Sequence, residues 1–175
     1  MANGVTWHRL EDLAAKNFQE VPNGPGIYFV RWSKGGEAIP INRLSGCDNN
    51  GILYIGSAKN LRRRVKQLWK GVNGDVRGHT IGKTIKFCTV SEVIKPSKLE
   101  ASWEVLESYT SAKAQEVSAI YTYSRKYKEP PPLNLEIGRE RCMILGLGKL
   151  GRSLLTPESD EYVRCYKVRS LSRSI

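Results

Sequence analysis

The sequence predicts an α/β fold, a small three-stranded sandwich whose sheet is flanked by helices. Two observations lead to this prediction. Short runs rich in β-branched and aromatic residues alternate along the chain with longer runs whose apolar residues recur at helical spacing. The length of 175 residues, with 40% hydrophobic and 26% charged residues, suits one globular domain and a modest appendage.

The first part of the chain predicts two strands joined by a long connection. Thr6 and the run LEDLAAKNF predict a short capped opening helix, which the Pro- and Gly-rich stretch VPNGPG at 21–26 ends. IYFVRW at 27–32 and ILYIG at 52–56 are the first two predicted strands. The connection at 33–51 is much longer than the roughly 2 to 5 residues of most hairpin loops, which indicates an elaborated or functional loop.

The second part predicts two helices, a strand and a long helix. Apolar residues at i, i+4 and i+7 in 61–70 indicate a helix with one buried stripe. The segment GHTIGKTIKFCTV at 78–90 is compatible with helix or strand, and we predict a helix. SWEVLES at 102–108 is the predicted third strand. The longest helical pattern, 111–127, has Ser111 as its predicted N-cap and three prolines after its end.

We expect three parts in the chain. They are a helical lead-in at 1–22, a core at 23–135, and a C-terminal extension at 136–175 that packs on the core and ends in a basic tail. The extension contains a Gly-x-Gly-x-x-Gly pattern at 146–151. We assign no dinucleotide site to this pattern, because Pro157 interrupts the helix that such a site requires.

Composition favours a nucleic-acid partner. The chain has 28 Lys and Arg against 17 Asp and Glu, a formal charge of +11, which gives the surface a positive potential. No apolar run approaches the roughly 18 residues of a membrane span, and the N-terminus has no signal-peptide core. The 4 cysteines form no CxxC pair, so we expect them to be reduced and mostly to pack. We therefore expect a cytoplasmic or nucleoid-associated protein that binds DNA and no membrane.

Two side chains suit the cleavage of a phosphodiester bond. This reaction needs an aligned nucleophile, cations on the nonbridging oxygens and a proton acceptor. Among the consecutive arginines 62–64, Arg64 borders the buried stripe, so its guanidinium is held ready for bidentate binding of a phosphate. Glu116 heads a row of apolar and aromatic residues on the long helix, a position that favours a metal-bound carboxylate. One carboxylate, with waters and a substrate phosphate, suits magnesium.

Five elements in order resemble the GIY-YIG nuclease superfamily, over about residues 20–135. They are GIY at 26–28, YIG at 54–56, Arg64, Glu116 on a later helix, and Asn134 after PPPL. The resemblance implies a three-stranded antiparallel sheet flanked by helices and a metal-dependent DNA endonuclease with one Mg²⁺ or Mn²⁺ per site. It also implies that Tyr28 is the base or proton relay, Tyr54 positions water or phosphate, Arg64 binds the scissile phosphate, Glu116 holds the metal and Asn134 braces the site.

One departure from the family pattern leaves the proton path open. Many members carry a His or Tyr one helical turn after the arginine, where this chain has Leu68. A phenol has a pKa of about 10, so Tyr28 needs a neighbouring cation, the metal or another acceptor to act as a base. His79 is a further catalytic candidate. The alternative function is a nucleic-acid-binding module that has the nuclease fold but weak or absent catalysis.

Each candidate also has a structural interpretation. The tyrosines can pack a sheet face, Glu116 can be a surface partner of Lys113, Asn134 can cap a turn, and His79 can start a helix. For DNA, we expect backbone phosphates to contact basic residues on the exposed sides of two helices: Lys59, Arg62, Arg63, Lys66, Lys70, Arg125, Lys126 and Lys128. The expected substrate is double-stranded or branched DNA, bound by a monomer or a homodimer. Restriction, repair and mobile-element roles stay open.

Overall fold

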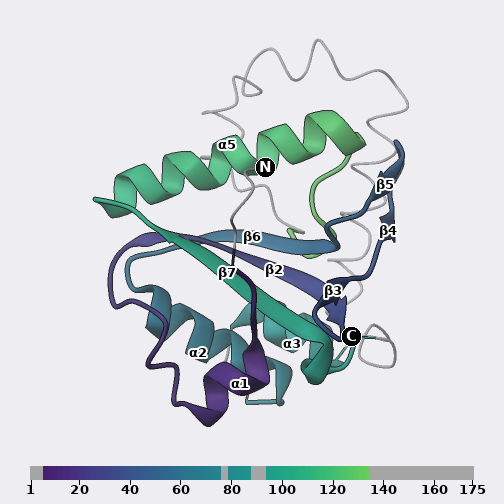
Figure 1. The fold of residues 1–175 in the computed structure, drawn as a ribbon. Helices are drawn as coiled ribbons and strands as arrows, with labels where there is room; N and C mark the ends of the chain where they lie inside the picture. The colour runs from purple at the N-terminus through teal and green to yellow at the C-terminus, as the bar shows by residue number, and fades with distance from the viewer. Residues whose placement is uncertain (1–5, 76–78, 88–93, 135–175) are drawn as a thin grey trace, which may run out of the picture. The chain divides into compact units, whose positions relative to one another are not determined.

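The computed structural model describes residues 6–75, 79–87 and 94–134. Its main sheet has β2 (Gly26–Lys34) in the middle, with β7 (Leu99–Val105) on one side and β6 (Ile52–Ala58) on the other, all antiparallel (Figure 1). The predicted three-stranded antiparallel sheet is therefore confirmed. Two-residue strands extend it: β1 (His8–Arg9) pairs with β7, and β3 (Glu37–Ala38) pairs with the end of β2.

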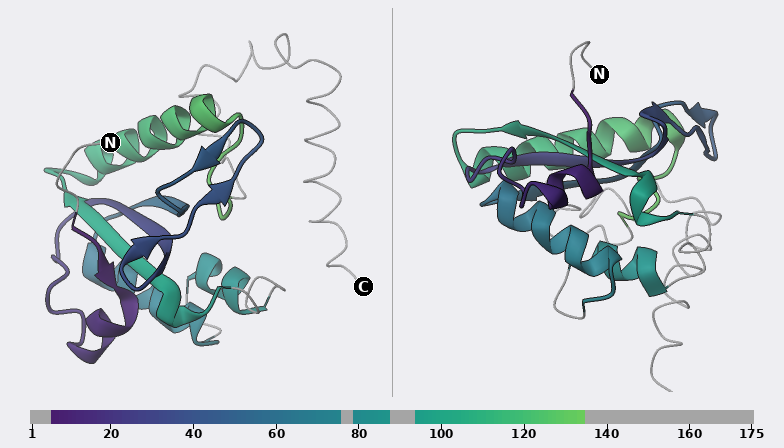
Figure 2. Two further views of the ribbon diagram at one scale, coloured as in Figure 1. Left: turned by 45° about the vertical axis from the view of Figure 1, so that its right-hand side comes forward. Right: turned by 60° about the horizontal axis from the view of Figure 1, so that its bottom comes forward.

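Helices cover both faces of this sheet because the side chains of β2 alternate between two apolar layers. Ile27 packs in a cluster with Ile120 of α5 (Tyr109–Tyr127), while Tyr28 and Val30 pack in the cluster on the other face. The second cluster is supplied by α1 (Leu10–Ala15), α2 (Leu61–Val72) and α3 (Thr80–Phe87). Figures 1 and 2 show α5 on one side of the sheet and the three shorter helices on the other. The edge strand β6 thus lies between two helical layers.

Helix α2 follows β6 directly, as predicted. Its N-cap is Asn60, whose side-chain oxygen accepts a hydrogen bond from the Arg63 backbone N–H at 2.9 Å. Leu61, Val65 and Leu68 are fully buried and form the predicted stripe. The stripe faces the sheet, so the remaining sides of α2 are left for charged residues.

Helix α3 confirms the helical prediction for this segment, and two glycines let it approach α2 very closely. A Cβ added at Gly82 would lie 2.6 Å from the backbone oxygen of Leu68, and one at Gly71 would lie 2.7 Å from that of His79. No larger residue fits at either position without moving a backbone. This contact holds His79, at the start of α3, against the C-terminal half of α2.

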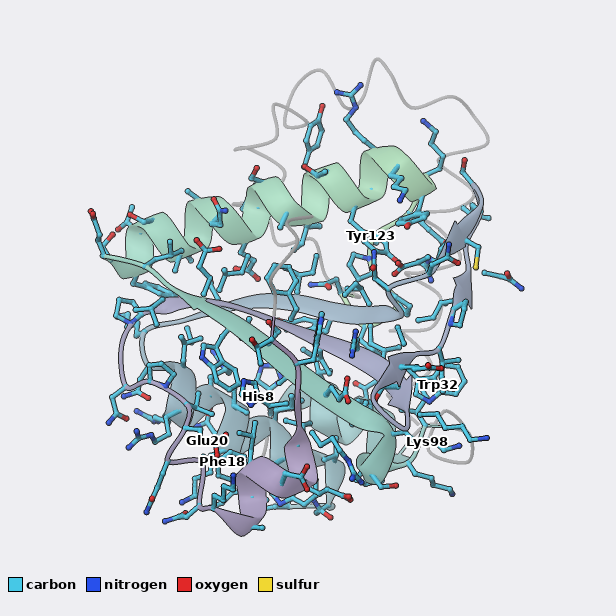
Figure 3. The ribbon with its side chains drawn as sticks, in the orientation of Figure 1. His8, Phe18, Glu20, Trp32, Lys98 and Tyr123 are labelled. Atoms are coloured by element: carbon cyan, nitrogen blue, oxygen red, sulfur yellow. The ribbon has the colours of Figure 1, made fainter. Side chains whose placement is uncertain are left out.

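The predicted long connection is an elaborated loop fixed to α5. It contains β3 and the two-stranded pair of β4 (Ile41–Asn42) and β5 (Cys47–Asp48). The buried carboxylate of Asp48 accepts hydrogen bonds from the Ile52 backbone N–H at 2.9 Å and from the Tyr123 hydroxyl at 3.0 Å. Tyr123 lies beneath the C-terminal half of α5 (Figure 3). A buried carboxylate with several donors makes this insertion a rigid part of the domain.

The predicted starts of two helices are wrong. The opening helix begins at Leu10 after Arg9, not after Thr6, because the chain at His8–Arg9 is extended and pairs with β7. Helix α5 begins after Ser108, whose hydroxyl oxygen accepts from the Ser111 backbone N–H at 3.0 Å. Ser111 therefore lies in the first turn and is not the N-cap.

Further predictions need correction or lie beyond the described residues. The third strand is Leu99–Val105 and not 102–108, because Leu99 and Ala101 belong to the core. Cys47 is exposed and is therefore an exception to the prediction that the cysteines mostly pack. The other three cysteines, the extension at 136–175 and its glycine pattern lie outside the described residues. Within the described ranges, no helix is long and apolar enough to cross a membrane.

Candidate active site

The two sequence triplets meet as a single pair of tyrosines. Tyr28 of β2 is the register partner of Gly56 of β6, and Tyr54 lies two residues before this glycine. The ring centroids of Tyr28 and Tyr54 are 5.7 Å apart. A Cβ at Gly56 would lie 2.5 Å from Tyr54 Cε1 and 2.9 Å from Tyr28 Cζ. Glycine is therefore required at position 56, because both rings occupy the space of a side chain there.

Tyr28 is buried with an unsatisfied hydroxyl. It is 1% exposed, and within the described part of the chain its Oη makes no hydrogen bond of regular geometry, although the Tyr54 side chain is close enough to act on its pKa. Burial raises the pKa of Tyr28 well above its ordinary value; the neighbouring Tyr54 and Glu116 act in the same direction, and the Arg64 guanidinium opposes them. Leaving a buried hydroxyl unpaired costs about 1–3 kcal/mol. Such an atom marks a position where a substrate group, water or cation would be favoured.

Glu116 reaches the site from the other helical layer. It is 2% exposed, so it is not a surface residue, and its Oε2 accepts a hydrogen bond from Ser57 Oγ at 2.7 Å. Its row on α5 continues through Ile120, Tyr123 and Tyr127, all buried as the sequence pattern predicts. Ser57 was not among the predicted site residues, although it directly follows the YIG triplet.

Arg64 and His79 approach the tyrosine pair from α2 and α3. The ring of His79 lies edge-on to Tyr54, with 6.0 Å between the centroids. Burial lowers the pKa of His79 to about 4, and the positive charge of Arg64 acts in the same direction. The positive charge of the half-buried Arg64 also opposes the rise in the pKa of Tyr28. The structure thus gathers five predicted residues at one site: Tyr28, Tyr54, Arg64, His79 and Glu116.

A backbone hydrogen bond fixes which nitrogen of His79 carries the proton. The Ile81 backbone N–H donates to His79 Nδ1 at 3.1 Å in the first turn of α3. An accepting Nδ1 is unprotonated, so the proton of the neutral ring is on Nε2. His79 is therefore a helix-start residue, as the alternative interpretation held, and it also presents an N–H donor beside Tyr54. Because Nε2 of the neutral ring already carries a proton, this nitrogen cannot accept another one as a base.

Asn134 closes part of the outer edge of β6. Its Oδ1 accepts from the Ile55 backbone N–H at 3.0 Å, and its Nδ2 donates to the Ile55 carbonyl at 2.8 Å. The Leu133 N–H donates to the Leu53 carbonyl at 2.9 Å. A side-chain amide here replaces the backbone of a neighbouring strand, and it holds the strand between Tyr54 and Gly56. Asn134 also closes a turn, with its own N–H bonded to the Pro131 carbonyl at 2.9 Å.

A basic pocket lies along the exposed side of α2. It has a volume of about 360 Å³ and is lined only by amides and cations: Asn23, Asn60, Arg62, Arg63, Lys66, Gln67 and Lys70. Arg62 Nε and Nη2 donate to the carbonyls of Val21 and Gln19 at 2.7 and 3.0 Å, so this guanidinium mainly holds the preceding loop. Lys66 Nζ donates to Asn17 at 2.8 Å. Arg63 and Lys70 are exposed.

The other predicted DNA-contacting residues lie at the two ends of α5. Lys59 Nζ is 5.4 Å from the ring centroid of Tyr109, at the helix start. At its end, Arg125, Lys126 and Lys128 are exposed. The only carboxylate within α5 is the buried Glu116, and α2 contains none. Both helices beside β6 therefore present a positive surface.

The donor set is compatible with a single hard cation. In the ranges described, no group of three or more His, Cys, Asp or Glu could enclose a metal ion. One buried carboxylate, Glu116, is a hard oxygen ligand. Mg²⁺ and Mn²⁺ accept few protein ligands and complete their shells with waters and phosphate oxygens, so this residue fits such an ion.

The sheet, the paired triplets and the site at the β6 edge define a small α/β nuclease domain. Residues 25–128 match the family model of the GIY-YIG catalytic domain, and the chain belongs to the GIY-YIG family. This match confirms the family that the sequence resembles.

Solved structures show a more distant likeness. One is the GIY-YIG N-terminal endonuclease domain of UvrC from Thermotoga maritima bound to magnesium, with 20% identity, a TM-score of 0.37, and coverage of 71% of this chain and 97% of that chain. A point mutant of the same domain has 20% identity and a TM-score of 0.38, covering 72% of this chain and 98% of that one. A search of curated proteins found no match.

Proposed function

We propose that this protein is a divalent-metal-dependent endonuclease that hydrolyses the phosphodiester bonds of DNA. The observation that carries the proposal is the gathering of a buried tyrosine, an arginine and a buried glutamate at one strand edge, between two basic helices. These groups are those that the reaction requires: a proton acceptor, a cation for the phosphate and a ligand for a metal.

Arg64 is the proposed ligand of the scissile phosphate. It is half-buried on α2, and it influences the pKa of both Tyr28 and His79, so its charge is directed into the site. A guanidinium that is already oriented stabilises the extra charge of the transition state without first being ordered. Tyr54 and the Nε2–H of His79 are the proposed donors that position the phosphate or the attacking water.

Tyr28 is the proposed proton acceptor. Its raised pKa keeps it a neutral phenol in the unliganded protein, so its deprotonation needs positive charge that arrives with the substrate complex. A divalent cation held by Glu116 would supply such charge, polarise the phosphate and acidify bound water. The Arg64 guanidinium opposes the rise in the pKa of Tyr28, so it would act together with the cation to favour the phenolate.

One observation favours the alternative, a DNA-binding module with weak catalysis. Leu68 is fully buried in the core, at the position where many family members carry a polar His or Tyr. It cannot reach the substrate, so this chain lacks one group of the usual site. His79 enters from α3 beside Tyr54, and we propose that it supplies a hydrogen-bond donor in its place.

Plasmid nicking with Mg²⁺ tests the proposal. The intact protein should nick supercoiled DNA, and Arg64→Ala should reduce the single-turnover rate by about a hundredfold or more, the effect of losing one preorganised charge. Glu116→Ala should abolish the response to metal. Glu104→Ala, which removes an exposed carboxylate from β7, is the matched control and should cut normally. An intact protein that binds DNA but cuts nothing with Mg²⁺ or Mn²⁺ would establish the binding-module alternative instead.

A further inference from the structure

We propose that Ser57 is a positioning residue that orients the carboxylate of Glu116 toward the divalent cation. The inference rests on the proposed function, because it concerns how the metal ligand of that site is held. Ser57 is not part of the sequence motif. It lies on β6, whereas Glu116, the proposed metal ligand, lies on α5.

Ser57 and Glu116 form a buried hydrogen bond between the sheet and helix α5. Ser57 Oγ donates to Glu116 Oε2 at 2.7 Å, with Ser57 8% exposed and Glu116 2% exposed. Hydrogen bonds to an ionised acceptor are short and about twice as strong as neutral ones. A glutamate has three side-chain torsions, and a donor fixed on a strand restricts all of them at once.

Strand alternation makes position 57 the one that can perform this role. Gly56 is opposite Tyr28, on the face of the sheet toward α2, whereas Ser57 is opposite Ile27, which packs toward α5. Consecutive side chains of a strand point to opposite faces, so residue 57 is the first one after the tyrosine pair that faces Glu116. Strand β6 thus carries Tyr54 toward α2 on one face and Ser57 toward α5 on the other.

Asn134 fixes the backbone on which Ser57 stands. The amide of Asn134 pairs with both backbone groups of Ile55, two residues before Ser57 on the outer edge of β6. Because edge-facing groups alternate along an antiparallel strand, the backbone N–H and carbonyl of Ser57 face this same edge. Asn134 therefore fixes the position of the Ser57 backbone along β6, close to the tyrosine pair.

The expected effect follows from how metal ligands behave generally. Carboxylates that bind metals are themselves held by hydrogen bonds, and removing such an outer partner lowers metal affinity by about 10- to 100-fold. Loss of the Ser57 hydroxyl should therefore weaken metal binding while it leaves DNA contacts intact. This separates a positioning role from a merely structural one, because a strand serine that only packs does not change the affinity for a cation.

Binding of Mn²⁺ to the metal-free protein without DNA, followed by electron paramagnetic resonance of the free ion, gives a readout besides activity. Ser57→Ala should raise the Kd for Mn²⁺ about tenfold or more, and Ser57→Thr, which keeps the hydroxyl, should restore most of the affinity. Ser102→Ala is the matched control, because Ser102 is buried in β7, two strands away, and pairs with Phe29 on the same face. This control should bind Mn²⁺ like the intact protein.

Single-turnover cleavage against Mg²⁺ concentration completes the test. For Ser57→Ala, half-maximal cleavage should shift to about tenfold higher Mg²⁺, with much of the rate recovered at saturation. If Ser57→Ala binds Mn²⁺ and responds to Mg²⁺ like the intact protein while Glu116→Gln loses both, Ser57 does not position the ligand and only this inference fails. If the intact protein neither binds Mn²⁺ nor cleaves DNA, the proposed function fails and the inference with it.

Discussion

At the scale of single residues, His79 illustrates how a backbone contact restricts chemistry. The ring stands at the start of α3, where Nδ1 accepts from the Ile81 N–H. Protonation of Nδ1 would break this hydrogen bond, and burial next to Arg64 also disfavours the charged ring. The side chain is therefore suited to donate through Nε2 at neutral pH and poorly suited to accept a proton.

This arrangement predicts an acid-sensitive contribution to stability. The pKa of His79 is about 4 in the folded protein against 6.5 as its ordinary value, so between these pH values the unfolded chain binds more protons. The contribution is fully present above about pH 6.5 and is lost as the pH falls through about 4. The free energy of unfolding of the intact protein should fall as the pH is lowered from 7.5 to 4.5. In the His79→Gln variant this fall should be smaller by about 2 kcal/mol.

Urea denaturation at several pH values measures this difference. His8→Gln is a useful comparison, because it removes the other imidazole from the described chain. A His79→Gln variant that keeps the full pH dependence of the intact protein would contradict the assignment of a buried neutral ring.

The sequence could point to those candidate residues whose chemistry is marked by a pattern. Tyr28 and Tyr54 follow from the triplets and the family resemblance, Arg64 from the helical stripe, and Glu116 from its row of apolar neighbours. Ser57 could not be found in this way, because strand alternation shows that residues 56 and 57 face opposite sides but not which helix covers each side. That information exists only after α5 packs on the sheet.

At the scale of elements, the contact between α2 and α3 determines the position of His79. Their backbones touch at Gly71 and Gly82, and the His79 N–H donates to the Gln67 carbonyl at 2.9 Å. Repeated local contacts of this kind leave little freedom for the segment that carries the ring. The candidate site therefore depends on the packing of α2 against α3, because α2 carries Arg64 and the start of α3 carries His79.

Gly82→Ala should separate the two helices. The added Cβ would lie 2.6 Å from the Leu68 carbonyl oxygen and 2.7 Å from the Val72 nitrogen, which are backbone atoms that cannot turn away. Overpacking of this kind destabilises by about 1–3 kcal/mol, and we expect a matching fall in the free energy of unfolding together with slower cleavage. Thermal melting and single-turnover rates measure the two effects.

Gly24→Ala provides the control for this substitution. An added Cβ there would make an ordinary contact of 3.5 Å with a side-chain atom of Val105, and it should change stability by much less. Equal stability of Gly82→Ala and the intact protein would mean that the helices can separate without cost.

The elements differed in how far the sequence could predict them. Strands β2 and β6 and helix α2 each repeat a periodic pattern over several residues, and they were predicted correctly. Strands β1, β3, β4 and β5 have two residues each, which is too short for any periodicity to be recognised. The start of α5 moved from Ser111 to Ser108 because two serines there can both cap a helix, and tertiary packing selects between them.

At the scale of the whole domain, charge is distributed unevenly about the sheet. The exposed sides of α2 and α5, which flank β6, carry cations without carboxylates. Exposed carboxylates such as Asp12 and Glu104 lie on α1 and on β7, the strand on the other side of β2 from β6. The potential therefore directs a polyanion to the β6 edge, where the candidate active site lies.

The proposed contact of DNA with both helices at once predicts additive salt effects. Arg63→Ala on α2 and Lys126→Ala on α5 should each flatten the dependence of log affinity on log salt by about one unit, and the double variant by about two. Both single variants should cleave normally at saturating DNA. Filter binding at several salt concentrations measures the slopes.

Lys16→Ala is the control, because Lys16 follows α1 and its ammonium pairs with Glu20 at 2.6 Å, so its charge is already engaged by a carboxylate. A slope that changes for Arg63→Ala alone would place the DNA against one helical layer only.

The amide of Asn134 has a consequence for how the protein behaves at high concentration. An exposed strand edge offers unpaired N–H and carbonyl groups to any extended chain, which is the usual route to sheet polymerisation. The side-chain amide of Asn134 pairs with the backbone N–H and carbonyl of Ile55. Unlike a neighbouring strand, this amide offers no further row of backbone groups to another molecule. The strand edge can thus stay open to a nucleic acid while its growth by addition of further strands is stopped.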